Sequence, residues 1–226
     1  MKTALTMIMK AILGIFLFAG LPLIGWGIFD LLGYFSNPAR TAYIAIVVVM
    51  QIAIVVAFPE IGRQGSPGKA TVQRQKLAIV LLQVLSLAIV LLAPFCDRRR
   101  IGALPSLDWL RFLGLAIFVI GFVLMNWAEI ALGKYFSIQV TVQEDHRLMT
   151  DGPFRYIRNP RYLGIILNNI GISLVFRSWL ALILTVALVA VLLWRIHDEE
   201  ALMQAEFGES WEAYRSHTWR LLPFVC

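Results

Sequence analysis

Long apolar runs constrain the fold of this chain more than any other feature of its sequence. Four runs have about 20 residues or more, which is the length of helix that crosses the hydrocarbon layer of a bilayer. Only 15% of the residues are charged, whereas a soluble domain carries about 25%. We therefore predict an all-α polytopic membrane protein rather than a soluble enzyme. Five to six membrane helices are expected, at residues 8–32, 41–59, 77–95, 110–132, 162–176 and 179–196.

The last two apolar runs and the first one differ from an ordinary membrane span. The last two runs are separated only by Arg177 and Ser178, and they predict a tight C-terminal helical hairpin. The first arm of that hairpin, with about 15 residues, is short for a full crossing. At the N-terminus, the first run is longer than a typical signal-peptide core and lacks a small-x-small cleavage site, so we interpret it as a retained span.

Lysine and arginine are divided unequally between the two sides of the predicted bundle. Fourteen of the 20 lie at the N-terminus, in the polar stretch after residue 132, or in other segments on that same side. Because cytoplasmic loops carry an excess of basic residues, this side is predicted to face the cytoplasm. Arg98, Arg99 and Arg100 lie on the other side and violate the rule. Topology and anionic lipid headgroups explain the net charge of +6, and no nucleic-acid partner is expected.

Polar chemistry is concentrated in the C-terminal part of the chain. We predict that residues 1–132 form N-terminal transmembrane helices, and that residues 133–226 form a catalytic, cofactor-binding region that includes the hairpin. Walker, G-x-G-x-x-G and nucleophile-elbow motifs are absent from the sequence, which disfavours P-loop and Rossmann-type nucleotide binding. Any active site is therefore expected in the second part.

Cysteine and histidine spacing gives no indication of a metal site. Cys96 and Cys226 lie 130 positions apart, so they predict neither a disulfide framework nor a zinc site. The three histidines, His146, His197 and His217, are too scattered to indicate metal ligands. No metal is predicted.

The helix that follows the last apolar run carries an unusual group of charges. Arg195 and Glu199 are four residues apart and share a helix face, which allows an ion pair at the membrane boundary. The pair has two interpretations. The first is a snorkelling arginine beside a solvated acidic run. In the second, a desolvated pair at the mouth of a cavity holds a charged substrate group.

A second candidate region precedes and enters the hairpin. Gly152 and Pro153 indicate a turn, and Pro160 suits the first turn of the next helix, where its missing N–H costs no hydrogen bond. The free N–H groups of such a helix N-terminus suit a carboxylate or another anion. Asn168 and Asn169 are adjacent amides within an apolar run, so at least one is expected to face a cavity or a neighbouring helix.

Four separated elements of the C-terminal part carry a family resemblance. They are Gly-Pro-Phe-Arg-Tyr-Ile-Arg-Asn-Pro-Arg-Tyr-Leu-Gly at 152–164, Arg195 with Glu199 and Glu200, Phe207-Gly208 with Tyr214, and Pro223-Phe224. In this order they resemble the isoprenylcysteine carboxyl methyltransferase and phospholipid methyltransferase superfamily, over about the last 90 residues. The resemblance implies an integral-membrane methyltransferase that binds S-adenosylmethionine without a Rossmann fold, in a cytoplasm-facing pocket.

The resemblance also implies roles for individual residues. Arg195 and Glu199 match the catalytic Arg and Glu of the family, and Glu200 matches the neighbouring acid. Asn159 stands where the family usually has His; Asn can hydrogen-bond but cannot change charge near neutral pH. Together with two amides of the hairpin, the predicted cofactor-binding residues are His146, Arg147, Leu148, Met149, Phe154, Asn159, Pro160, Arg161, Tyr162, Asn168, Asn169 and Glu200.

The reaction implied is a direct in-line methyl transfer to a lipophilic acceptor that enters from the bilayer. Such a transfer requires chiefly alignment and the exclusion of water. With a carboxylate acceptor, Arg195 would hold the anion and Glu199 would orient Arg195 or the cofactor. With an amine acceptor, Glu199 or Glu200 would hold the ammonium and help to remove its proton. The sequence leaves both acceptors open, and it does not indicate an oligomeric state.

Two other functional classes compete with this interpretation. Membrane sterol reductases, which use NADPH, share a similar C-terminal pattern but have many more spans than this chain. A small transporter or membrane scaffold would place ionisable residues along the middle of the bundle, whereas here they concentrate at one end. The sequence therefore favours an enzyme at the membrane interface.

Overall fold

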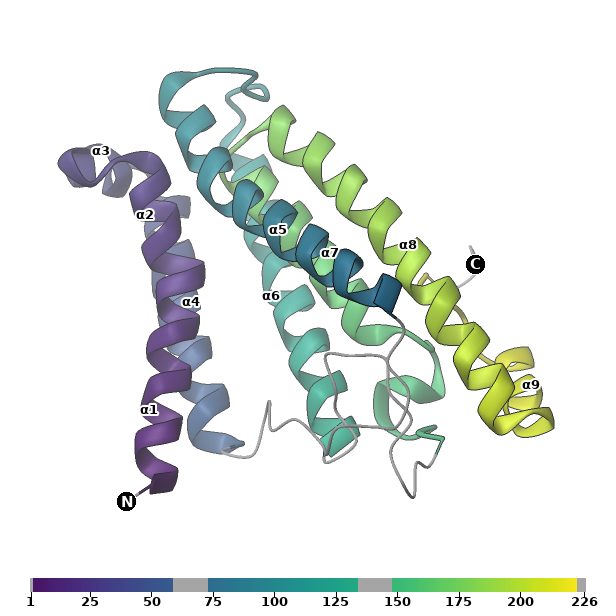
Figure 1. Cartoon of the computed structure of the whole chain (residues 1–226). Helices are drawn as coiled ribbons and strands as arrows, with labels where there is room; N and C mark the ends of the chain where they lie inside the picture. Colours follow the sequence, from purple (N-terminus) through teal and green to yellow (C-terminus); the bar gives the residue numbers. More distant parts are fainter. Residues whose placement is uncertain (1, 59–72, 134–147, 223–226) are drawn as a thin grey trace.

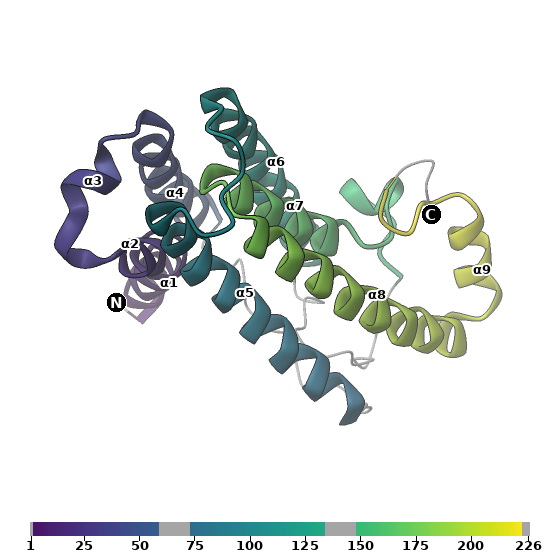
Figure 2. The ribbon, with the colours of Figure 1, turned by 90° about the horizontal axis from the view of Figure 1, so that it is seen from above.

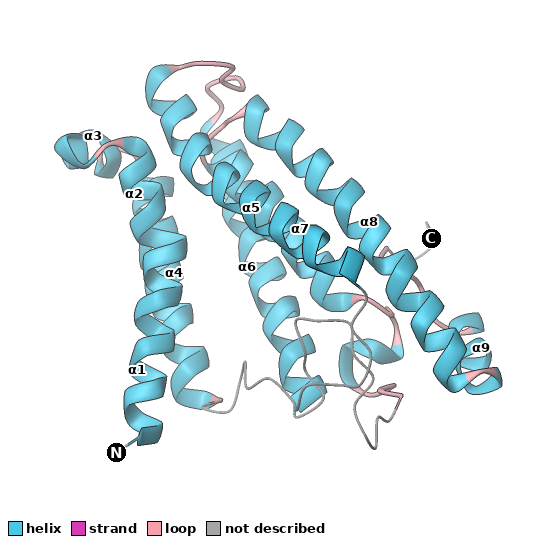
Figure 3. Ribbon diagram, viewed as in Figure 1, coloured by secondary structure: helices cyan, strands magenta, loops and turns pink. Residues whose placement is uncertain are grey.

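The computed structural model describes residues 2–58, 73–133 and 148–222, and within these ranges it contains helices but no strands (Figures 1 and 3). An all-α architecture was predicted and is confirmed for this part of the chain. The helices, in chain order, are α1 (Lys2–Ile15), η1 (Phe16–Gly20), α2 (Leu21–Trp26), η2 (Ile28–Asp30), α3 (Leu31–Phe35), α4 (Pro38–Ala57), α5 (Gln73–Arg99), α6 (Asp108–Leu132), η4 (Gly152–Arg155), α7 (Pro160–Val175), α8 (Trp179–Phe207) and α9 (Glu209–Ser216).

Five stretches of helix among the described residues are long and apolar enough to cross a membrane. They correspond to the first four predicted spans and the second arm of the predicted hairpin: Ile8–Trp26, Pro38–Ala57, Gln75–Arg99, Asp108–Leu132 and Trp179–Phe207. The first arm of the hairpin is α7, with 16 residues. At 1.5 Å per residue it is about 24 Å long, which is less than the thickness of the hydrocarbon layer.

One predicted boundary is wrong, for a local reason, and one helix extends well beyond its apolar run. The first span was expected to reach residue 32, but it ends at Trp26 because Gly27 adopts a φ of 112°, which breaks the helix. The last apolar run ends at residue 196, and the helix that was predicted to continue past it through Glu199 extends to Phe207 in α8. This extension carries charged residues that other parts of the chain contact, so hydropathy alone does not detect it.

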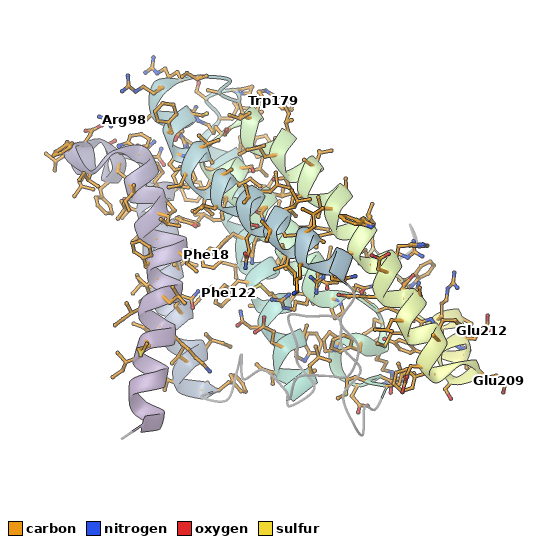
Figure 4. All side chains as sticks on the ribbon, viewed as in Figure 1. Phe18, Arg98, Phe122, Trp179, Glu209 and Glu212 are labelled. Carbon is orange, nitrogen blue, oxygen red and sulfur yellow. The ribbon has the colours of Figure 1, made fainter. Side chains whose placement is uncertain are left out.

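Different segments of the chain form the two ends of the bundle. The start of α1, the segment before α7 and the short helix α9 lie at one end, whereas α3, the α5–α6 connection and the α7–α8 turn lie at the other (Figures 1 and 2). Glu209 and Glu212 mark the first end, and Arg98 and Trp179 mark the second (Figure 4). The predicted grouping of the N-terminus with the polar C-terminal region is therefore confirmed.

Helices α6 and α7 approach each other closely because glycines meet along their contact. Gly114 and Gly121 on α6 face Gly171 and Gly164 on α7. A Cβ at Gly164 would lie 2.7 Å from the carbonyl oxygen of Gly121, and one at Gly171 would lie 2.7 Å from the carbonyl oxygen of Gly114. Small residues permit such close backbone approach in membrane helices. The seam fixes α7, and with it the side chains that α7 carries, against α6.

We expect Gly164→Ala to destabilise the fold by about 1–3 kcal/mol, because the new methyl group would overlap backbone atoms of α6. Thermal unfolding in detergent would measure this as a lower midpoint. Gly20→Ala is the matched control, since the atoms nearest to its Cβ would belong to the side chain of Phe16, at 3.0 Å, and not to the backbone of another helix. Equal midpoints for both variants would contradict the proposed role of the seam.

A buried ion cluster joins four segments at the end of the bundle marked by Arg98. Only 1% of the Asp97 side chain is exposed, and it pairs with Arg111 at 2.8 Å, Arg40 at 3.2 Å and Arg177 at 3.2 Å. Arg40 also lies over the ring of Trp26, 4.3 Å from its centroid. The three arginines come from α4, α6 and the α7–α8 turn, so one carboxylate of α5 fixes the relative positions of these elements.

Candidate active site

The predicted Arg195 and Glu199 pair is present in the structure and has a third member. Arg195 Nε donates to Glu199 Oε1 at 2.9 Å and to the hydroxyl of Tyr162 at 2.7 Å. The same hydroxyl donates to Glu199 Oε1 at 2.5 Å. Only 5% of the Arg195 side chain is exposed, compared with 21% for Glu199. The pair is therefore desolvated, as one of the two sequence interpretations required, and Tyr162 of α7 orients it.

A cavity of about 570 Å³ lies next to this triad. Its polar lining comes from α5, α7 and α8, and its apolar lining comes mostly from the first span and α5. The lining residues are Leu17, Phe18, Leu21, Ile79, Leu82, Gln83, Ser86, Leu87, Val90, Met125, Arg161, Tyr162, Ile165, Asn168, Asn169 and Arg195. A cavity of this size is typical of small-molecule sites. It combines an apolar wall with guanidinium groups, which suits an amphipathic ligand that carries an anion.

The adjacent amides of α7 both line the cavity, as the sequence led us to expect. Asn169 donates to the carbonyl oxygen of Ile165 within its own helix, at 2.8 Å. The Nδ2 of Asn168 contacts the sulfur of Met125 at 3.9 Å, whereas its buried Oδ1 has no hydrogen-bond partner in the described structure. A buried acceptor without a donor costs about 1–3 kcal/mol. This oxygen lies beside Gly121 of α6, in the contact between the two helices.

Arg161 lies in the first turn of α7 and is held by an ion pair. Its Nε donates to Glu129 Oε1 of α6 at 2.9 Å. Glu129 therefore contacts a residue that lines the cavity.

Glu200 joins the segment before α7 to the C-terminal tail. Its Oε1 accepts from Arg158 at 3.1 Å, and its Oε2 accepts from Arg220 Nη2 at 2.7 Å. The side chain of Glu200 is 9% exposed, and that of Arg158 is 7% exposed. Asn159, which replaces the usual His, donates from Nδ2 to the carbonyl oxygen of Arg220 at 3.1 Å. Both residues therefore hold the tail in place, and their predicted role in cofactor binding stays a prediction.

The tail makes a second attachment through Tyr214 on α9. Its hydroxyl donates to the carbonyl oxygen of Phe154 in η4 at 2.7 Å. Burial raises the pKa of Tyr214 to about 12, so the phenol keeps the proton that this hydrogen bond requires. Phe154 itself is buried, with 8% of its surface exposed. The tail thus supports the segment that leads into the cavity-lining helix.

Residues 113–205 of the chain match the model of the isoprenylcysteine carboxyl methyltransferase (ICMT) family. Over 165 residues the chain is 27% identical to a probable protein-S-isoprenylcysteine O-methyltransferase of Oryza sativa subsp. indica, which covers 70% of this chain and 84% of the relative. It is 30% identical over 118 residues to the protein-S-isoprenylcysteine O-methyltransferase of Schizosaccharomyces pombe, covering 49% of this chain and 48% of the relative. The C-terminal part of this chain therefore resembles the ICMT family.

Among solved structures, the chain resembles a eukaryotic intramembrane Ras methyltransferase, ICMT, with a TM-score of 0.50 and 21% identity. The match covers 82% of this chain and 66% of that chain, and it shows a shared fold. On these matches the chain is a multi-pass integral-membrane methyltransferase that uses S-adenosylmethionine and a lipophilic acceptor. The matches favour this class over a sterol reductase and over a transporter or scaffold.

The structure brings together part of the predicted site. Five predicted residues line one cavity: Arg161, Tyr162, Asn168, Asn169 and Arg195. Pro160 is buried at the start of α7, as its motif predicted. Leu148 and Met149 are partly buried ahead of η4. His146 and Arg147 lie outside the described residues.

Sequence reasoning missed the contribution of the first span and α5 to the cavity. Phe18 lies on the π-helical turn η1 and contributes to the lining; Figure 4 shows it near the middle of the first span. The two polar residues of α5 that line the cavity, Gln83 and Ser86, were also missed. Their spacing of three residues within an apolar run was a signal that could have identified them. Among the described residues, no group of three or more His, Cys, Asp or Glu could hold a metal.

Proposed function

We propose that this chain methylates the carboxylate of an isoprenylated cysteine at the Arg195 end of the cavity. One observation favours a carboxylate acceptor: the charged side chains that line the cavity, Arg161 and Arg195, are both cations. A guanidinium group matches a carboxylate in charge and in its planar donor geometry. The relatives named protein-S-isoprenylcysteine O-methyltransferase support the same acceptor.

An amine acceptor fits this arrangement less well. An ammonium would need an accepting carboxylate in the cavity, yet the lining contains no Asp or Glu among the described residues. Glu199 accepts hydrogen bonds from Arg195 and Tyr162, and Glu200 is paired with two arginines. Moving either acid toward an ammonium would break an ion pair with a buried arginine, which typically costs about 3–5 kcal/mol.

In the proposed reaction the protein binds and aligns its substrates and transfers no proton. S-adenosylmethionine supplies a methyl group bound to a positively charged sulfur. The carboxylate oxygen of the acceptor forms the new O–CH₃ bond as the S–CH₃ bond breaks, and the sulfur keeps that electron pair. Arg195 holds the carboxylate in position, while Glu199 and Tyr162 fix the orientation of Arg195. The apolar wall excludes water, which would otherwise solvate the carboxylate.

We further propose that the methyl donor is held at the same end of the bundle, by the segment that leads into α7 and by α7 itself. The residues assigned to this role are His146, Arg147, Leu148, Met149, Phe154, Asn159, Pro160, Arg161, Tyr162, Asn168, Asn169 and Glu200. The polar side chains of α7 that line the cavity support a polar ligand here. The excess of basic residues at this end supports an active site that faces the cytoplasm.

Binding calorimetry in lipid nanodiscs tests the acceptor. N-acetyl-S-farnesylcysteine should bind at least about tenfold more tightly than its neutral primary amide, with S-adenosylhomocysteine present in both titrations, because only the carboxylate pairs with guanidinium groups. Arg195→Gln should abolish this difference, while Arg215→Gln, an exposed position on α9, should retain it. Equal affinity of the wild-type protein for the acid and the amide would exclude a carboxylate acceptor at this site.

A further inference from the structure

The C-terminal tail turns back from α9 and lies beside the segment that leads into α7 (Figure 2). The backbone N–H of Trp219 donates to the carbonyl oxygen of Tyr156 at 3.0 Å, and the carbonyl oxygen of Trp219 accepts from the N–H of Arg158 at 2.7 Å. The side chain of Asn159 donates to the carbonyl oxygen of Arg220 at 3.1 Å. Two consecutive tail residues therefore hold this segment at successive positions up to the start of α7.

One carboxylate of α8 ties side chains of the segment and the tail together. Glu200 accepts from Arg158 Nε at 3.1 Å, and from Arg220 Nε and Nη2 at 3.0 and 2.7 Å. The side chains of Glu200 and Arg158 are nearly buried, whereas that of Arg220 is 34% exposed. Glu200 directly follows Glu199, which pairs with Arg195. Arg220 is therefore the outermost member of an ion cluster that reaches the helical turn carrying the site.

Arg220 contacts two residues assigned to the methyl donor, through different groups. Its carbonyl oxygen accepts from Asn159, and its guanidinium group pairs with Glu200. Without the guanidinium group, the tail would lose its ion pair with α8, and the segment would be held by a less fixed tail. A donor would then have to order both the tail and the segment as it binds. That ordering costs affinity, which a preordered site does not lose.

The acceptor end of the site does not depend on these contacts. Arg195 is oriented by Tyr162 of α7 and by Glu199 of its own helix. None of the described tail residues lines the cavity. Loosening the tail should therefore weaken the binding of the donor and spare the binding of the acceptor.

From these contacts, we propose that Arg220 is a positioning residue of the methyl-donor site, and that the C-terminal tail sets the affinity for the donor through it. The inference rests on the proposed function, in which the segment leading into α7 holds the donor. It adds the tail residues 218–220 to that site, none of which was among the predicted site residues.

Calorimetry with S-adenosylhomocysteine in nanodiscs measures the affinity of the donor site without turnover. We expect Arg220→Gln to raise the Kd at least about tenfold, because a charge-assisted contact that orders the site is lost. The KM for N-acetyl-S-farnesylcysteine, and kcat at saturating S-adenosylmethionine, should stay within about twofold of wild type. A variant that merely loosened the whole fold would change both affinities, so this separation is specific to positioning of the donor site.

Arg220→Lys tests rescue by a conservative change. Both contacting nitrogens of Arg220 reach the same oxygen, Glu200 Oε2, so a single ammonium group can replace them. The Kd of this variant should stay within about threefold of wild type. Arg215→Gln is the matched control, because it removes the same charge from an exposed position on α9 and should leave the Kd unaltered.

Tyr214→Phe provides a second variant that acts on the tail without changing any charge. It removes the hydrogen bond from Tyr214 to the carbonyl oxygen of Phe154, and it should raise the Kd for S-adenosylhomocysteine about threefold. Thermal midpoints measured without the donor establish that each variant is folded.

An unchanged Kd in both Arg220→Gln and Tyr214→Phe overturns the inference and leaves the proposed function intact. Equal losses of affinity for S-adenosylhomocysteine and for the farnesyl acceptor in Arg220→Gln overturn it as well. If the wild-type protein binds S-adenosylhomocysteine but does not methylate the acceptor, the proposed acceptor fails, and the calorimetry still decides the role of Arg220. If the wild-type protein does not bind S-adenosylhomocysteine, the proposed donor site fails and the inference fails with it.

Discussion

Arg195→Lys should lower kcat/KM for methyl transfer at least about a hundredfold, while the protein remains folded. Lysine keeps a positive charge near Glu199, but its single ammonium group cannot reproduce the planar guanidinium that contacts both Tyr162 and Glu199 through Nε. The acceptor carboxylate would then be bound in a less defined position, which reduces the rate of a reaction that depends on alignment. Initial rates with labelled S-adenosylmethionine, at several acceptor concentrations, measure the effect.

Two further variants separate positioning from general destabilisation. Tyr162→Phe removes the hydroxyl that contacts both charged groups, and we expect an approximately tenfold lower kcat. Arg215→Lys, an exposed change on α9, should leave kcat and KM unaltered. Thermal midpoints within a few degrees of wild type would establish that the variants are folded. Activity of folded Arg195→Lys within twofold of wild type would remove this residue from the reaction.

Asp97→Asn should give the largest loss of stability of any single change considered for this protein, about 3–5 kcal/mol. The substitution removes the negative charge that three arginines share, and Arg111 and Arg40 would remain as uncompensated cations, with 3% and 8% of their side chains exposed. Arg177, which ends the α7–α8 turn, would lose its partner as well. Unfolding in detergent, followed by heat or by denaturant, measures the change.

Asp30→Asn is the matched control for this prediction. The side chains of Asp30 and Arg98 are 38% and 32% exposed, so their ion pair is expected to contribute only about 0–1 kcal/mol. The cluster around Asp97 lies at the opposite end of the bundle from Arg195, so the folded fraction of Asp97→Asn should retain a normal kcat. Unchanged stability of Asp97→Asn would show that the cluster does not hold the four segments together.

The membrane helices could be predicted because hydropathy alone determines them. Each of the first four predicted spans overlaps an observed helix, since the apolar runs are long and are separated by polar segments. Boundaries were less predictable where backbone geometry or tertiary contacts decide them. Gly27 ends the first span through a positive φ, and the last turns of α8 pack against the C-terminal tail through Glu200.

The candidate site was predictable only where its residues are close in sequence. Arg195 and Glu199 are four residues apart on one helix, and their ion pair follows from helix geometry. Tyr162 belonged to the predicted cofactor segment, but its contact with Arg195 spans 33 positions of sequence, so no spacing rule reveals it. The same limit applies to Asp97, whose partners Arg40 and Arg177 are 57 and 80 positions away.

Carboxyl methylation at Arg195 is tested by the transfer of a labelled methyl group from S-adenosylmethionine to a farnesylcysteine acceptor, with the purified protein in nanodiscs. We expect a labelled product that releases methanol in mild base, as a carboxyl methyl ester does. We also expect Arg195→Lys to reduce product formation at least about a hundredfold. Label found only in a base-stable product, or no difference between wild type and Arg195→Lys, would contradict a carboxyl methyl transfer at Arg195.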